Sequence, residues 1–75
     1  MSYEKELANL KANLSKNIKK HRKEIGLAQE RLALEAGVDR TLVSKIEREI
    51  ANPSLEILFK ISIILDVSLS DLLGD

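Results

Sequence analysis

The chain contains few of the residues that small proteins often use as reinforcement. Its 75 residues include no cysteine and only one proline. Without cysteine, neither a disulfide nor a thiolate-bound zinc ion can stabilise the fold, so one small hydrophobic core must do so. The most apolar stretch is bounded by Lys60 and Asp66 and is far shorter than the roughly 18 residues of a membrane span. Because the N-terminus is polar and unlike a signal peptide, we expect one cytoplasmic domain, residues 1–75, without a membrane partner.

The residues that carry catalysis or bind metals are also scarce. His21 is the only histidine, and it has no second histidine or cysteine with which to form a metal site or an activated nucleophile. The acidic residues show no paired arrangement that suggests a catalytic cleft. We therefore predict that the protein is not an enzyme and that it uses no metal, no cofactor and no small-molecule ligand.

Positive charge is distributed unevenly, although the formal net charge is zero. Residues 1–48 contain 11 lysines and arginines against 7 acidic residues, a net charge of +4. Residues 49–75 contain 1 lysine against 5 acidic residues, a net charge of −4. This asymmetry favours a basic half that contacts a polyanion and an acidic half turned away from it. Ordinary scatter of solvated charge is the alternative.

The spacing of apolar residues predicts an all-α domain of five helices, because no segment alternates as a strand does. The first helix is unusually long and ends at Gly26, with a break near residues 13–15 left open. Leu7, Leu10, Leu14, Ile18, His21 and Ile25 recur every three or four residues along it. The other helices are expected at residues 29–36, 40–48, 55–65 and 69–73.

A glycine-containing turn joins the second and third of these helices. Gly37 supplies the positive φ angle that a sharp bend requires, and Asp39 is a suitable N-cap for the next helix. Val43 and Ile46 form the inner face of that helix, which leaves the opposite face to polar residues. This arrangement is typical of a helix-turn-helix, whose second helix enters the major groove of DNA. A generic pair of helices in a bundle has the same spacing, so spacing alone does not decide between them.

Three stretches of sequence carry a resemblance to a known family. They are QERLALEAGVDRTLVSKIER (29–48), NPSL (52–55) and LDVSLSDLL (65–73). Together they resemble the Xre/phage-repressor (lambda-type) helix-turn-helix family, and most of all the controller proteins of restriction–modification systems. The resemblance implies a five-helix, lambda-repressor-like DNA-binding domain with a lengthened first helix. Its parts would be an N-terminal helical extension (1–13), the helix-turn-helix (29–48) and dimerisation helices (54–73).

The resemblance also implies a role for individual residues. Arg22 and Glu47 would form an ion pair between the first and third helices. Gln29 would contact a DNA phosphate and support the third helix, and Lys19 is the basic residue of the first helix that we assign to phosphate contact. The remaining expected DNA contacts are Arg40, Thr41, Ser44 and Lys45 to bases, and Arg48 and Asn52 to the backbone.

Some positions depart from the family pattern. Ala28 stands where a hydroxyl residue usually caps the second helix, a loss of about 1 kcal/mol. Leu42 replaces a tyrosine that is frequent in controller proteins. Glu49 replaces a common glycine, and Ile50 and Ala51 replace common basic residues. We therefore expect weaker non-specific DNA affinity and a larger contribution from cooperative dimers.

The fourth helix is apolar nearly all round, which predicts burial nearly all round. One side, with Leu55, Leu58, Ile61, Ser62 and Leu65, is sufficient for the core. The excess predicts a two-fold interface between two copies. We assign to that interface Phe59, Ile63, Ile64, Leu69 and Leu72. Packing of Leu7 and Leu10 onto the same surface is the rival explanation.

The sequence as a whole predicts a transcriptional regulator that binds double-stranded DNA. It would act as a homodimer on a palindromic operator, as restriction–modification controller proteins do, in the bacterial cytoplasm at the nucleoid. RNA polymerase is a further candidate partner. The alternative is an antitoxin-type protein or another Xre-family repressor whose main partner is a protein.

Overall fold

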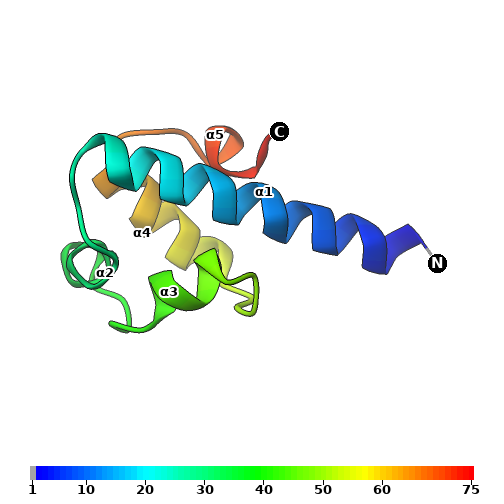
Figure 1. Ribbon diagram of the computed structural model, residues 1–75, viewed down its shortest axis with the longest axis horizontal. Coiled ribbons are helices and arrows are strands. Elements are labelled where there is room, and N and C mark those ends of the chain that lie inside the picture. Colours follow the sequence, from blue (N-terminus) through cyan, green and yellow to red (C-terminus); the bar gives the residue numbers. More distant parts are fainter. Residues whose placement is uncertain (1) are drawn as a thin grey trace.

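The computed structural model describes residues 2–75, apart from the side chain of Ser2. Within these residues the chain forms five helices and no strand, which confirms the predicted all-α, lambda-repressor-like fold. The helices are α1 (Ser2–Glu24), α2 (Gln29–Ala36), α3 (Leu42–Glu47), α4 (Leu55–Leu65) and α5 (Leu69–Leu73). In Figure 1, α1 lies across the top of α2, α3 and α4, and α5 packs beside it near the C-terminus. None of these helices combines the length and apolarity that crossing a membrane requires.

The boundaries of α2 follow from its terminal residues. Gly37 has a φ angle of 70° and its amide donates to the carbonyl oxygen of Leu34, so the chain leaves the helix in the left-handed conformation that glycine adopts readily. At the other end, Ala28 provides no side-chain cap. The predicted range of α2 and both of its predicted ends are therefore confirmed.

Helix α3 is shorter than residues 40–48, the range that the sequence predicted. The Leu42 amide donates to the Asp39 carbonyl oxygen at 3.0 Å, and the first α-helical bond into this segment runs from the Lys45 amide to the Thr41 carbonyl oxygen at 3.1 Å. Arg40 and Thr41 thus belong to a tight turn that leads into α3. The local bonds of Asp39 account for this difference, because a turn closed over three residues is tighter than an α-helical turn.

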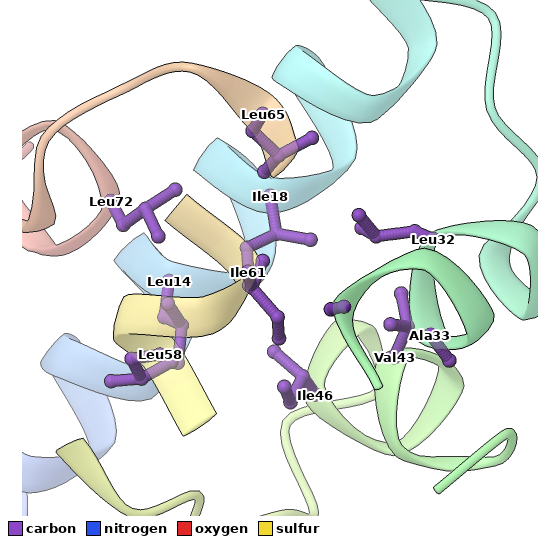
Figure 2. Packing of buried hydrophobic residues seen from close by; sticks show 11 residues of the cluster. Leu14, Ile18, Leu32, Ala33, Val43, Ile46, Leu58, Ile61, Leu65 and Leu72 are labelled. Carbon is purple, nitrogen blue, oxygen red and sulfur yellow. The ribbon is translucent and has the colours of Figure 1, made fainter. Parts of the chain in front are cut away.

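The hydrophobic core lies between α1 and the other four helices (Figure 2). In that view Ile61 of α4 lies between Ile18 of α1 and Ile46 of α3. Ala33 of α2 is fully buried beside Val43, where a larger side chain would push α2 and α3 apart. The buried apolar residues are Leu14, Ile18, Leu32, Ala33, Ala36, Val43, Ile46, Leu58, Ile61, Leu65 and Leu72.

Helix α1 is continuous, with no break near residues 13–15. Its C-terminal half packs on the core, whereas its N-terminal half projects past the other helices (Figure 1). The molecule is therefore elongated, measuring 37 × 20 × 19 Å. Leu10 and Ile25, which the periodicity placed on the buried face, are both exposed. Periodicity identified the correct face of the helix, but the other helices cover that face only along the C-terminal half, and Ile25 lies just beyond the last residue of α1.

Two predictions about the C-terminal helices were wrong. Leu55, expected in the core, is 68% exposed because it lies in the first turn of α4, beyond the helices that cover the later turns. Leu72, expected at a dimer interface, is fully buried within this chain. It fills the space where α5 packs on α1, so it cannot also contact a second copy.

Candidate nucleic-acid interface

Four polar side chains form the outer face of α3 and of the turn before it. Arg40, Thr41 and Lys45 are exposed and Ser44 is half-buried. Val43, on the opposite side of the helix, is fully buried and fixes the direction in which this face points. The turn and the helix together present two basic residues and two hydroxyls on one side, which can offer hydrogen-bond donors and acceptors to base edges.

Asp39 organises the turn that carries Arg40 and Thr41. Its carboxylate accepts hydrogen bonds from the amide and the hydroxyl of Thr41, with 2.8 Å between the amide nitrogen and the carboxylate oxygen. The hydrogen bond from the Thr41 hydroxyl lowers the pKa of the Asp39 carboxyl most, and the bond from the Thr41 amide lowers that pKa further. Because the Thr41 hydroxyl proton is already donated to Asp39, Thr41 can offer a ligand only its methyl group and its oxygen lone pairs.

Glu47 anchors the far end of α3. The Arg22 Nε and Nη2 atoms donate to the two carboxylate oxygens of Glu47 at 2.7 and 2.9 Å. Gln29 adds a third bond from Nε2, at 2.9 Å. Arg22 and Glu47 are only 9% and 7% exposed, so the structure brings together the pair expected from the sequence. A single carboxylate therefore links α1, α2 and α3.

The charges of this pair stabilise one another. Burial alone raises the pKa of Glu47, but the hydrogen bonds from Arg22 and Gln29 outweigh it and leave that pKa below its ordinary value. The bond to Glu47 likewise raises the pKa of Arg22 despite its burial. Both residues are therefore ionised at neutral pH, and a bidentate arginine–carboxylate pair fixes orientation as well as distance.

The other expected backbone contacts surround α3 without touching one another. Arg48 caps the C-terminal end of α3, and Asn52 lies in the loop before α4; both are exposed. Lys19 is exposed on α1, on the side that lies near Glu47. Gln29 bonds to Glu47 through one amide proton and keeps a second for another acceptor.

Glu49 is one of the departures from the family pattern, at a position where the resemblance implies a common glycine. Its φ angle is 65°, in the left-handed region that residues with a Cβ adopt at a cost. This is a backbone conformation that glycine adopts readily, and the exposed Glu49 side chain adds a negative charge next to α3.

The expected interface residues of α4 and α5 fall into two groups. Phe59 and Ile63 are 53% and 60% exposed, and with Leu55 they form an apolar stripe of one residue in every four along α4. Ile64 and Leu69 are half-buried against the core.

Comparison with known proteins agrees with this geometry. Residues 18–72 match the helix-turn-helix family HTH_3. The chain belongs to this Xre-type family. This HTH_3 chain is 43% identical to the transcriptional regulator SinR of Bacillus subtilis over 63 residues. These residues are 83% of this chain but 57% of SinR, so the chain spans little more than half of that relative.

Several solved structures have the same fold as this HTH_3 chain. The hypothetical transcription factor NHTF from Neisseria is similar with a TM-score of 0.83 at 38% identity, covering 87% of this chain and 75% of NHTF. The restriction–modification controller protein C.AhdI from Aeromonas hydrophila has a TM-score of 0.78 at 32% identity, covering 83% of this chain and 94% of C.AhdI. SinR bound to DNA has a TM-score of 0.77 at 44% identity, over 81% of this chain and 98% of that one.

Two buried polar residues of this HTH_3 domain were not predicted from the sequence. The Ser15 hydroxyl donates to the Glu47 carbonyl oxygen at 2.6 Å. The Asn17 amide donates to the carbonyl oxygens of Leu72 and Gly74, at 3.0 and 2.6 Å, and ties α5 to α1. Both residues are adjacent in sequence to apolar core residues of α1, and this position was the one sequence feature that could have indicated their burial. A local sequence pattern cannot identify a hydrogen-bond partner 30 or more residues away.

Proposed function

We propose that this HTH_3 protein is a sequence-specific DNA-binding transcriptional regulator. The observation that carries the proposal is the exposed face of Arg40, Thr41, Ser44 and Lys45. In the major groove, the Arg40 guanidinium can donate two bonds to O6 and N7 of guanine, and the Thr41 methyl group can meet a thymine methyl. Ser44 and Lys45, one turn further along, would reach neighbouring bases.

The residues around this face would set its register on the DNA backbone. Arg48, Asn52 and Lys19 would contact phosphates, together with the free amide proton of Gln29. Because Gln29 also bonds to Glu47, a phosphate contact there would be coupled directly to the position of α3. The exposed Glu49 would oppose the phosphates, which supports weaker non-specific binding than a glycine at this position would allow.

We further propose that the protein acts as a homodimer on a palindromic operator. The apolar stripe of Leu55, Phe59 and Ile63 supports this step, because burial against a second copy would remove it from water. Ile64 and Leu69 would lie at the edge of that contact. Two copies of α3 would then enter successive major grooves, about 34 Å apart.

Among regulators, we propose a restriction–modification controller protein of the bacterial cytoplasm, acting at the nucleoid. The similarity to C.AhdI supports this, since it extends over 94% of that controller protein. RNA polymerase would be the partner of a controller that activates transcription. A second candidate is a regulator whose main partner is a protein, favoured by the similarity to SinR in its complex with the protein SinI.

The base-reading role can be tested with Arg40→Ala. We expect this variant to lose about 1–3 kcal/mol of affinity for the cognate operator and to lose preference at one base pair in each half-site. Lys16→Ala, which removes an exposed positive charge from α1, is the matched control and should retain that preference. Titration of operator and random duplexes separates the roles: equal losses on both would make Arg40 a phosphate ligand and contradict base readout.

The α4 interface can be tested by sedimentation at low micromolar concentration. Phe59→Glu and Ile63→Glu should convert a dimer to a monomer and abolish cooperative binding to the full operator. Leu34→Glu places the same charge at an exposed leucine of α2 and should leave the dimer intact. A monomeric wild-type protein, or dimers that survive both stripe substitutions, would show that the interface is not on α4.

A further inference from the structure

The projecting half of α1 carries an apolar stripe that this chain leaves largely uncovered. Tyr3, Leu7, Leu10 and Leu14 follow one another at steps of four, three and four residues, the heptad spacing of a coiled-coil seam. Tyr3 is 59% and Leu10 46% exposed, whereas Leu14 is buried where the stripe meets the core. The residues that match the HTH_3 family begin at 18, so the stripe precedes the matched region.

The stripe continues into a groove on the body of the protein. This groove encloses about 120 Å³ and is lined mainly by Leu10, Leu14, Pro53, Leu58 and Leu73. Its wall is therefore formed by α1, the loop before α4, α4 itself and the end of α5. A second apolar helix could therefore pack along the projecting half of α1, and one of its ends would then lie in this groove.

We propose that the occupant is the same segment of a second copy, packed antiparallel to the first. In the register that aligns the two stripes, Leu7 of one copy faces Leu10 of the other, and Tyr3 lies over the groove beside Leu14. The charges fit this register. Glu4 and Lys11 are seven residues apart and lie on the same side of the seam. Antiparallel packing therefore places Glu4 of each copy opposite Lys11 of the other, which gives two symmetry-related ion pairs.

The position of α3 is compatible with this pairing. Ser15 and Arg22 form the hydrogen bonds from α1 to Glu47. At about 100° per residue, these two side chains lie roughly a quarter turn around the axis of α1 from the stripe. A two-fold axis perpendicular to the paired helices therefore leaves both α3 helices on the same side. The midpoint between Ser15 and Arg22 lies about ten residues along α1 from the middle of the seam, which corresponds to ~15 Å. The same distance applies in the second copy, in the opposite direction, so the two α3 helices lie ~30 Å apart along the helix axis. That spacing is close to one turn of DNA.

A seam of two heptads is short, so the pairing is weak in free solution. Two copies already held on one duplex have a high effective concentration for each other, and there a weak contact becomes significant. On this basis, which rests on the proposed DNA binding, the projecting half of α1 joins neighbouring operator-bound dimers, and α4 forms each dimer.

The pairing can be measured without DNA in a Phe59→Glu background, which removes the α4 stripe. Sedimentation equilibrium at several hundred micromolar should then detect a residual dimer that Leu10→Glu eliminates. Glu4→Lys should weaken this dimer roughly tenfold, because two attractive pairs become repulsive. The double variant Glu4→Lys/Lys11→Glu should restore it.

Glu6→Lys is the matched control, since it makes the same charge change two residues along α1, at the opposite edge of the seam. In an antiparallel seam Glu6 does not meet Lys11, so this variant should leave the dimer unchanged; in a parallel seam Glu6 would be the residue that pairs with Lys11. An effect of Glu6→Lys in place of Glu4→Lys, or the absence of any Leu10-dependent dimer, would overturn the proposal. Affinity for an isolated half-site, measured on the same variants, should be unchanged, so failure of the pairing and failure of DNA binding are separate results.

Discussion

The two halves of α1 contain apolar residues at the same spacing, yet only one half is buried. In the C-terminal half, Leu14 and Ile18 face the core, and Ser15, Asn17 and Arg22 make long-range hydrogen bonds. In the N-terminal half, Tyr3 and Leu10 continue the same face with little opposite them. The difference shows that periodicity specifies which side of a helix is apolar, whereas the neighbouring helices determine how far along its length that side is covered.

The largest expected effect tests the polar anchor of the buried half. Glu47→Gln keeps the shape of the side chain but leaves the buried Arg22 without its counter-charge, which should cost about 3–5 kcal/mol of stability. Glu35→Gln disrupts the exposed pair between Arg31 and Glu35 and should cost less than about 0.5 kcal/mol. Urea unfolding monitored by circular dichroism compares the two. Equal effects would mean that Glu47 is not an anchor.

A second pair of variants compares the two halves of α1 directly. Ile18→Ala should destabilise the protein by about 2–5 kcal/mol, because it opens a cavity at a fully buried position. Leu10→Ala should change stability by less than about 0.5 kcal/mol at protein concentrations where the chain is monomeric. Thermal unfolding in dilute solution measures both. A large loss from Leu10→Ala would indicate that the projecting half is packed within the monomer.

The ionisation of Glu47 predicts a dependence on pH. Its pKa is lower in the folded protein than in the unfolded chain, through hydrogen bonds that outweigh burial. The pair therefore stabilises the fold fully above the ordinary glutamate pKa of about 4.3, and this contribution is lost as the pH falls through the folded pKa. The stability difference between wild type and Glu47→Gln should shrink in that acidic range. A difference that stayed constant from neutral to acidic pH would contradict the assignment.

The smallest expected effect concerns the loop between α3 and α4, which borders the projecting half of α1. Glu49→Gly should stabilise the fold by about 0.5–1 kcal/mol, since relief of the left-handed backbone exceeds the added entropy of the unfolded chain. Asp66→Gly, at a φ angle of 58°, should give a smaller gain because aspartate tolerates this conformation better. Chemical denaturation of both variants provides the comparison. A loss of stability in Glu49→Gly would mean that its side chain makes a favourable contact.

Much of the architecture was predictable because it depends on local chemistry. The ranges of α2, α4 and α5 and the role of Gly37 were confirmed, since glycine, serine caps and apolar spacing act within one or two turns. The start of α3 was predicted two residues early, because Asp39 can close either a tight turn or an α-helical turn. The exposure of Lys45 followed from helical geometry, whereas Arg40 and Thr41 are exposed in the turn before α3. The contacts of all three residues with DNA stay predictions.

The sequence by itself determined the helices, their apolar faces and the turn that sets α2 against α3, because these depend on residues close together in the chain. Only the tertiary structure decided that Leu72 is buried within one copy and that Leu55 and Leu10 are exposed. It also decided that Ser15 and Asn17 bond to α3 and to the end of α5. Burial and hydrogen bonding at these positions depend on segments 30 to 60 residues away, and the distance in space between such segments is set only when all five helices pack around one core.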